Sequence, residues 1–180
     1  MFAAPYIEEF FGGLTADIIR YFIFAGTPFL LLYVLFRNKM IRYKVQQKFP
    51  ENKHILREVG YSLLSMFIFS IFSVLVFVLQ QRGYTKIYTD IHAHSTGYFI
   101  FSIFAFIIAH DTYFYWSHRL MHHKKIYPYV HLIHHKSYNP TPWATFAFHP
   151  LEAVAQVLIL PIIVFAMPLH PLAIRLKSVS

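Results

Sequence analysis

Apolar residues run in four long stretches along the chain, and polar residues gather in the gaps between them. A helix needs about 20 apolar residues to cross a bilayer. Four windows approach that length: 18–36, 61–79, 98–116 and 151–169. The pattern predicts an all-α fold, an integral membrane bundle of about four hydrophobic helices.

The four windows differ in regularity. The window 61–79 contains no charged residue and is the clearest span. A Gly-Thr-Pro sequence ending at Pro28 interrupts the first window and predicts a kink. Pro161 and Pro168 fall in the last window, where they predict a kink or a re-entrant hairpin.

Composition supports the membrane assignment and narrows the chemistry. Hydrophobic residues make up 57% of the chain and charged residues 13%, a balance that a water-soluble domain of 180 residues could not bury. The length favours one compact unit. The chain has no cysteine, which excludes disulfides, thiolate metal ligands and cysteine nucleophiles. Any metal must therefore be held by nitrogen or oxygen atoms.

The charge pattern orients the predicted helices. The net charge is +8, and the basic residues fall in the gaps between apolar windows, which membrane topology explains better than nucleic-acid binding. The gaps at 37–60 and 117–150 are rich in lysine and arginine, whereas the gap at 80–97 contains only Arg82 and Lys86. By the positive-inside rule the two basic gaps face the cytoplasm. We expect a multi-pass membrane protein with no nucleic-acid partner.

Six of the twelve histidines fall in two clusters within the cytoplasmic segment 117–150. His118 and His122 share one face if the third helix continues past the membrane, and the second cluster repeats this spacing. In an ideal helix His123 points away from that face, so it joins the set only if the helix ends there. Imidazole binds iron, zinc, copper or nickel. We predict a histidine-rich helical cap with the metal ligands His118, His122, His123, His131, His134 and His135.

Other polar residues are candidates to support these ligands. Asp111 and Tyr115 precede His118 on one helical stripe and are either acceptors for a ligand imidazole or polar contacts within the bundle. His149 is a further candidate to support a ligand. Glu152, in the first turn after it, is either a helix-dipole partner or an acceptor behind a ligand. His110 is either a hydrogen-bonded core residue, which we favour, or an extra ligand. The isolated histidines, to which we assign no chemistry, are His54, His92, His94 and His170.

Three motifs together resemble a known family. The sequence HDTYFYWSHRLMHH at 110–123, HLIHH at 131–135 and AFHPLE at 147–152 are similar to the fatty acid hydroxylase and sterol desaturase superfamily of membrane non-haem di-iron enzymes. The resemblance implies two iron ions that use O2 to hydroxylate or desaturate a lipid, either a sterol or a fatty acyl chain. It also implies an electron donor such as a cytochrome b5, a ferredoxin or a reductase. It divides the chain into N-terminal membrane helices at 1–97 and a hydroxylase-like region at 98–180.

The resemblance also implies a third histidine region after the fourth apolar segment, and the sequence to residue 180 does not contain it. We therefore expect this chain to supply the first two histidine boxes of an incomplete site. The alternative is a truncated, catalytically inactive membrane protein that retains partial metal binding at most. A transporter fits less well because its ligands would lie at mid-depth in the bilayer. A haem protein also fits less well, because haem needs only one axial histidine on each of two facing helices and these clusters contain more.

Overall fold

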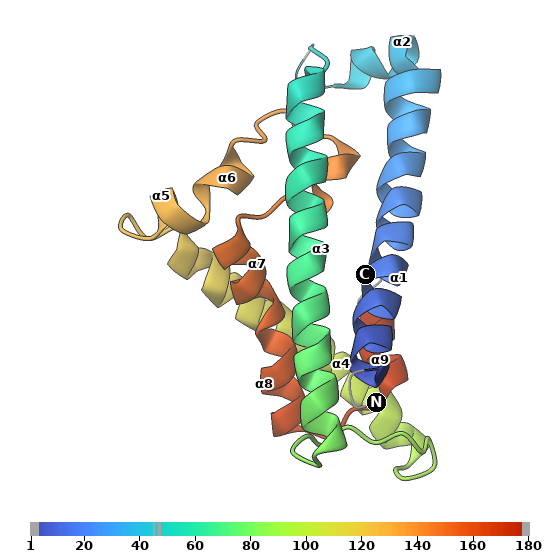
Figure 1. The fold of residues 1–180 in the computed structure, drawn as a ribbon. Coiled ribbons are helices and arrows are strands. Elements are labelled where there is room, and N and C mark those ends of the chain that lie inside the picture. The colour runs from blue at the N-terminus through green and yellow to red at the C-terminus, as the bar shows by residue number, and fades with distance from the viewer. Residues whose placement is uncertain (1–3, 45, 47, 178–180) are drawn as a thin grey trace.

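Three long helices form the frame of the molecule, seen in a computed structural model that describes residues 4–44, 46 and 48–177 (Figure 1). They are α1 (Ala4–Phe29), α3 (Asn52–Gln81) and α4 (Thr96–Met121). α1 and α3 pack side by side, and α4 crosses them at a tilt. Each of the three is long and apolar enough to cross a membrane, with α1 counted together with its continuation to Leu35. The predicted all-α membrane fold is confirmed.

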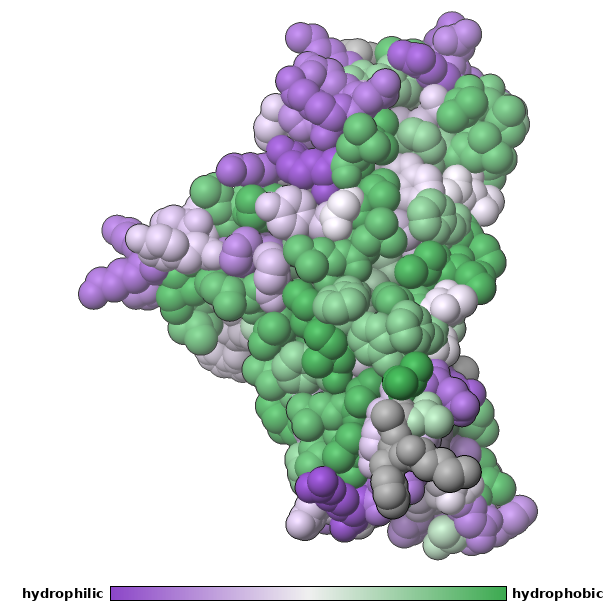
Figure 2. Space-filling model, viewed as in Figure 1, coloured by the Kyte–Doolittle hydropathy of each residue, from purple (hydrophilic) through white to green (hydrophobic). Residues whose placement is uncertain are grey.

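The surface of the bundle carries the apolar side chains that this fold leaves unburied. Phe24, Leu35, Phe101 and Ile108 are among the exposed residues of α1, its continuation and α4. Figure 2 shows apolar residues over the middle of one face, with hydrophilic residues gathered at both ends and at the projecting tip. Such a surface is stable against lipid rather than water.

The predicted interruption of the first window takes the form of a change in helix type. α1 continues through Pro28, and a π-helical segment, η1 (Leu30–Leu35), follows at once. At its end the Phe36 N–H donates to Leu31 O at 2.9 Å, five residues back. A proline removes one helical donor, and the wider turn is a known way to accommodate such a loss. The short helices α2 (Arg37–Met40) and η2 (Ile41–Tyr43) then lead toward α3.

The fourth apolar window does not form a long crossing helix, so the expectation of about four such helices is corrected to three within the described residues. It forms two short helices, α7 (Pro150–Val157) and α8 (Ile159–Ala166), which together span Pro150–Ala166. Pro161 lies in the first turn of α8 and has no N–H for the carbonyl four residues back, which explains the interruption. The chain then turns into α9 (Pro171–Lys177).

The loop after α3 and the segment after α8 close the end of the bundle opposite the histidine-rich segment. Ile87 pairs with Leu169 in an isolated parallel bridge, and the Tyr98 hydroxyl donates to Pro168 O at 3.1 Å. The buried His170 has its Nε2 3.2 Å from Thr89 O. His170 is thus part of the packing of this end.

The histidine-rich segment follows α4 and consists of three short elements. They are α5 (Tyr127–Val130), α6 (Leu132–His135) and the 3-10 helix η3 (Pro142–Phe146). The segment projects beside the upper half of α3 (Figure 1). Its last part, η3, packs on both α1 and α3, so the N-terminal helices fix where this segment lies.

Candidate metal centre

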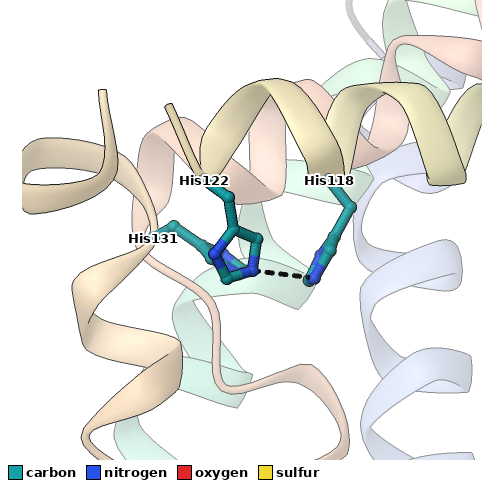
Figure 3. Close-up of side chains that lie close together, drawn as sticks. All are labelled: His118, His122 and His131. Carbon is teal, nitrogen blue, oxygen red and sulfur yellow. Dashed lines mark hydrogen bonds between the residues drawn. The ribbon is translucent and has the colours of Figure 1, made fainter. Parts of the chain in front are cut away.

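The last turns of α4 bring the first two histidines together. α4 ends at Met121, and His122 is its C-terminal capping residue. The Nε2 atoms of His118 and His122 lie 3.1 Å apart, as Figure 3 shows. The predicted continuation of the third helix beyond its apolar window therefore places both imidazoles on one face.

His131 completes a compact group of three. It lies at the junction between α5 and α6, with its side chain fully buried. Its ring centroid is 4.6 Å from that of His118 and 4.7 Å from that of His122. One potential ligand atom from each of the three side chains lies within 4.8 Å of the others (Figure 3).

His134 and His135 extend this group to five imidazoles. The His135 ring is 4.7 Å from His131 and 5.0 Å from His122. The His134 ring stacks on His131 at 5.2 Å and on Phe148 at 5.7 Å, and it also contacts the His135 ring at 5.7 Å. The sequence predicted one helical segment here, whereas the structure has two four-residue helices with a break at His131. That break is what turns His131 inward toward α4.

The spacing of these nitrogens fits a metal ion. Two imidazole nitrogens that bind one metal at about 2.1 Å are roughly 3.0 Å apart at a right angle and roughly 3.4 Å apart in a tetrahedron. The His118–His122 separation of 3.1 Å lies between these values. The widest separation in the group of three, 4.8 Å, exceeds the largest that such bonds allow, about 4.2 Å, so binding requires a small inward movement of the rings. The ligand set contains nitrogen atoms only, as iron, zinc or copper sites often do.

Glu152 stands behind His131. Its side chain is 1% exposed, and its Oε1 lies 2.9 Å from Nδ1 of His131. This contact does not have the direction of a hydrogen bond. Nε2 of His131 has no hydrogen-bond partner among the described residues. A carboxylate at Nδ1 favours the tautomer that leaves the Nε2 lone pair for a metal. Glu152 lies in the first turn of α7, and its contact with His131 favours the second of the two roles that the sequence left open, an acceptor behind a ligand.

Burial determines the charge of these groups. It lowers the pKa of His131 to about 3, and the neighbouring imidazoles add to the effect. Burial first, and neighbouring imidazoles second, also lower the pKa of His134 and of His135. Burial raises the pKa of Glu152 to about 8. At neutral pH the three imidazoles are therefore uncharged, which is the form that binds metals.

The structure does not bring four of the predicted site residues to the cluster. His123 is exposed, and its Nδ1 accepts from the Lys125 N–H at 3.4 Å. The Asp111 side chain is 72% exposed and lies 3.1 Å from His110 Nδ1. The Tyr115 hydroxyl accepts from Arg119 at 3.1 Å, and His149 caps α7.

The stacking along α4 explains why Asp111 and Tyr115 are absent from the cluster. Phe114 stacks on His118 at 5.5 Å, and His110 stacks on Phe114 at 6.4 Å. The side chains that lead to the cluster are therefore spaced four residues apart. Tyr115 and Asp111, three and seven positions before His118, lie to one side of this row.

Known proteins resemble the chain over most of its length. Residues 103–179 match the fatty acid hydroxylase family. The lathosterol oxidase of Rattus norvegicus is 33% identical over 159 residues, which cover 87% of this chain and 52% of that protein. The human lathosterol oxidase is 31% identical over the same shares, and a Delta(7)-sterol 5(6)-desaturase of Gibberella zeae is 31% identical over 83% of this chain and 45% of its own length. No solved structure matched.

The region that matches the fatty acid hydroxylase family contains all five clustered histidines and Glu152. The chain belongs to the fatty acid hydroxylase and sterol desaturase superfamily, as its histidine motifs predicted. It spans about half the length of the curated relatives that it matches.

Proposed function

We propose that this chain takes part in the O2-dependent oxidation of a sterol-type lipid at a histidine-bound iron site, by desaturation or hydroxylation. The curated relatives are named as a lathosterol oxidase and as Delta(7)-sterol 5(6)-desaturases, which supports a sterol substrate. The observation that carries the proposal is the convergence of His118, His122 and His131 within 4.8 Å.

The residues of the chain hold and shield the site. Glu152 lies 2.9 Å from Nδ1 of His131, where it would orient the imidazole once a metal binds, and the Phe148 ring beside His134 keeps water from one side of the cluster. Bound iron, two ions in the proposed complete site, would supply the O2 activation that side chains alone cannot provide. Desaturation removes two hydrogen atoms from neighbouring carbons. These two hydrogen atoms, together with two electrons from a donor and two protons, reduce one O2 to two water molecules.

The location of the cluster suits a membrane substrate. Glu58 and Ser62 of α3 bond to the loop that follows the second histidine cluster, where the uncharged apolar run of α3 begins. We place this end on the cytoplasmic side of a multi-pass protein because the basic gaps flank it. There a cytochrome b5, a ferredoxin or a reductase could deliver electrons. The region 98–180 would then form the catalytic part and 1–97 its membrane support.

The experiment is conversion of lathosterol by the purified chain in lipid nanodiscs, with iron, O2 and a reducing system. We expect a more unsaturated or hydroxylated sterol that depends on O2 and is lost in His131→Ala. The matched control is His123→Ala, which removes an exposed histidine outside the cluster. Lack of product from the iron-loaded chain would overturn the proposed activity.

A metal-binding membrane protein without turnover is the second candidate. It is favoured by the small number of ligand atoms, one each from three side chains, that lie within 4.8 Å of one another. Two irons in a protected site need more ligands than these. This candidate predicts about one metal ion per chain and no conversion, whereas an iron content near two would exclude it.

A further inference from the structure

A cavity of about 350 Å³ lies between the second histidine cluster and η3. One wall is His134, at the end of α6. The opposite wall is the stretch from Pro140 to η3, where small side chains leave space. The lining residues are His134, Ser137, Pro140, Thr141, Ala144, Thr145 and Ala147. The volume falls in the range typical of sites for small ligands.

The wall opposite His134 is anchored to the N-terminal helices. The Thr141 hydroxyl donates to Glu58 Oε2 at 2.6 Å, and the Glu58 side chain is 1% exposed. The hydroxyls of Tyr21 and Ser62 both donate to Trp143 O, at 2.7 and 2.9 Å. These bonds hold the loop against α1 and α3, so the cavity is part of the fold and not a gap in a loose surface.

The polar groups of the cavity suit a neutral hydroxyl. The described lining residues include no acidic side chain, no lysine and no arginine. Among the described residues Ser137 makes no side-chain hydrogen bond, so its hydroxyl is available as donor and acceptor. Thr145 donates to Pro142 O at 2.8 Å and keeps lone pairs that can accept. The remaining lining consists of the methyl groups of Ala144 and Ala147, the ring of Pro140 and the side chain of Thr141, whose hydroxyl is bonded to Glu58.

We propose that this cavity receives the hydroxyl-bearing end of a sterol, with Ser137 and Thr145 recognising its 3-hydroxyl. The proposal rests on the proposed function and makes it more specific. In a 5(6)-desaturation the reacting carbons begin two bonds from the carbon that carries the hydroxyl, so a hydroxyl site must adjoin the metal ligands. This cavity does so through His134, which stacks on His131 at 5.2 Å.

The test is equilibrium binding of lathosterol and of its 3-deoxy analogue to the chain in detergent, with no metal added. We expect lathosterol to bind about tenfold more tightly, the ratio that one hydrogen bond typically gives. Ser137→Ala should remove most of that preference. Ala144→Leu, which fills the cavity, should weaken lathosterol binding by tenfold or more, whereas the same change at the exposed Ala16 should not.

Equal binding of the two sterols, or unchanged lathosterol binding by Ala144→Leu, would overturn the proposal. If Ala144→Leu does not fold, the loss of preference in Ser137→Ala decides the matter. This test is independent of the test of the proposed function. Sterol binding is measured on the metal-free chain, whereas turnover is measured on the iron-loaded chain that carries none of these substitutions. If the chain converts lathosterol but binds both sterols equally, the proposed activity stands and the proposed hydroxyl site is overturned.

Discussion

The carboxyl of Glu152 lies 2.9 Å from the imidazole of His131, and both side chains are almost wholly buried. One residue begins α7 and the other separates α5 from α6, so the contact joins the histidine-rich segment to the helix that follows it. The pairing identifies which histidine is held most firmly, and several predictions depend on it.

Loss of the Glu152 carboxyl should weaken metal binding. Glu152→Ala removes the carboxyl that lies 2.9 Å from the buried Nδ1 of His131, and such changes typically cost 10- to 100-fold in affinity. The measurement is zinc or cobalt titration of the chain in detergent. The control is Glu51→Ala, which removes a glutamate whose side chain is 67% exposed. Equal affinities for the wild type and Glu152→Ala would contradict the assigned role.

The stability of the metal-free chain should fall as pH rises from 7.5 to 9. Burial raises the pKa of Glu152 to about 8, above its ordinary value of 4.5, so the folded chain binds this proton more tightly than the unfolded chain. The stabilisation is complete below pH 4.5 and is lost as pH rises through 8. Above pH 7.5 the lowered pKa values of His131, His134 and His135 add little slope, because these imidazoles are largely neutral in both states.

Thermal unfolding of chelator-treated protein measures this slope. The wild-type midpoint should drop between pH 7.5 and 9, and Glu152→Gln, which cannot ionise, should show a smaller drop. A midpoint that rises with pH in the wild type would show that Glu152 is ionised in the folded chain.

The buried Glu58 should make the loop before η3 sensitive to a single hydroxyl. Thr141→Val removes the donor at 2.6 Å and leaves Oε2 of the buried Glu58 with the longer bond from the Thr141 backbone N–H at 3.4 Å, while Oε1 has no partner among the described residues. An unsatisfied buried polar group costs about 1–3 kcal/mol. Thr145→Val, at an exposed site, should cost less. Equal unfolding midpoints for the two variants would contradict the anchoring role of Glu58.

Histidines inside and outside the cluster should differ in their effect on metal binding. His122 lies 3.1 Å from His118, whereas the adjacent His123 is exposed and contacts the backbone of Lys125. His122→Ala should therefore lower zinc affinity by at least tenfold and His123→Ala by less than threefold, as judged by competition with a chelator of known affinity. Similar losses in both variants would mean that the C-terminal end of α4 rearranges when metal binds.

Local patterns were enough to predict the long helices and the two histidine clusters. The windows 61–79 and 98–116 lie within α3 and α4, and the four-residue spacing of His118 and His122 places them together. Helical periodicity holds within one helix, and it therefore predicted the contacts that depend on one helix only.

Contacts between elements could not be predicted in this way. Asp111 and Tyr115 share an approximate stripe with His118, but the side-chain stacking through Phe114 decides which residues reach the cluster. The approach of Glu152 to His131 depends on how the chain turns back through η3, for which the sequence gives no spacing rule. Glu58 was missed as well, although a single acid just before the uncharged run of α3 was a signal that it needed a buried partner.

Metal analysis of the purified chain tests the central claim most directly. Wild-type protein loaded with ferrous iron under anaerobic conditions and then desalted should retain at least one iron per chain. His131→Ala should retain little, and His123→Ala should match the wild type. Absence of retained iron in the wild type, or equal iron in wild type and His131→Ala, would contradict the assignment of this histidine cluster as a metal site.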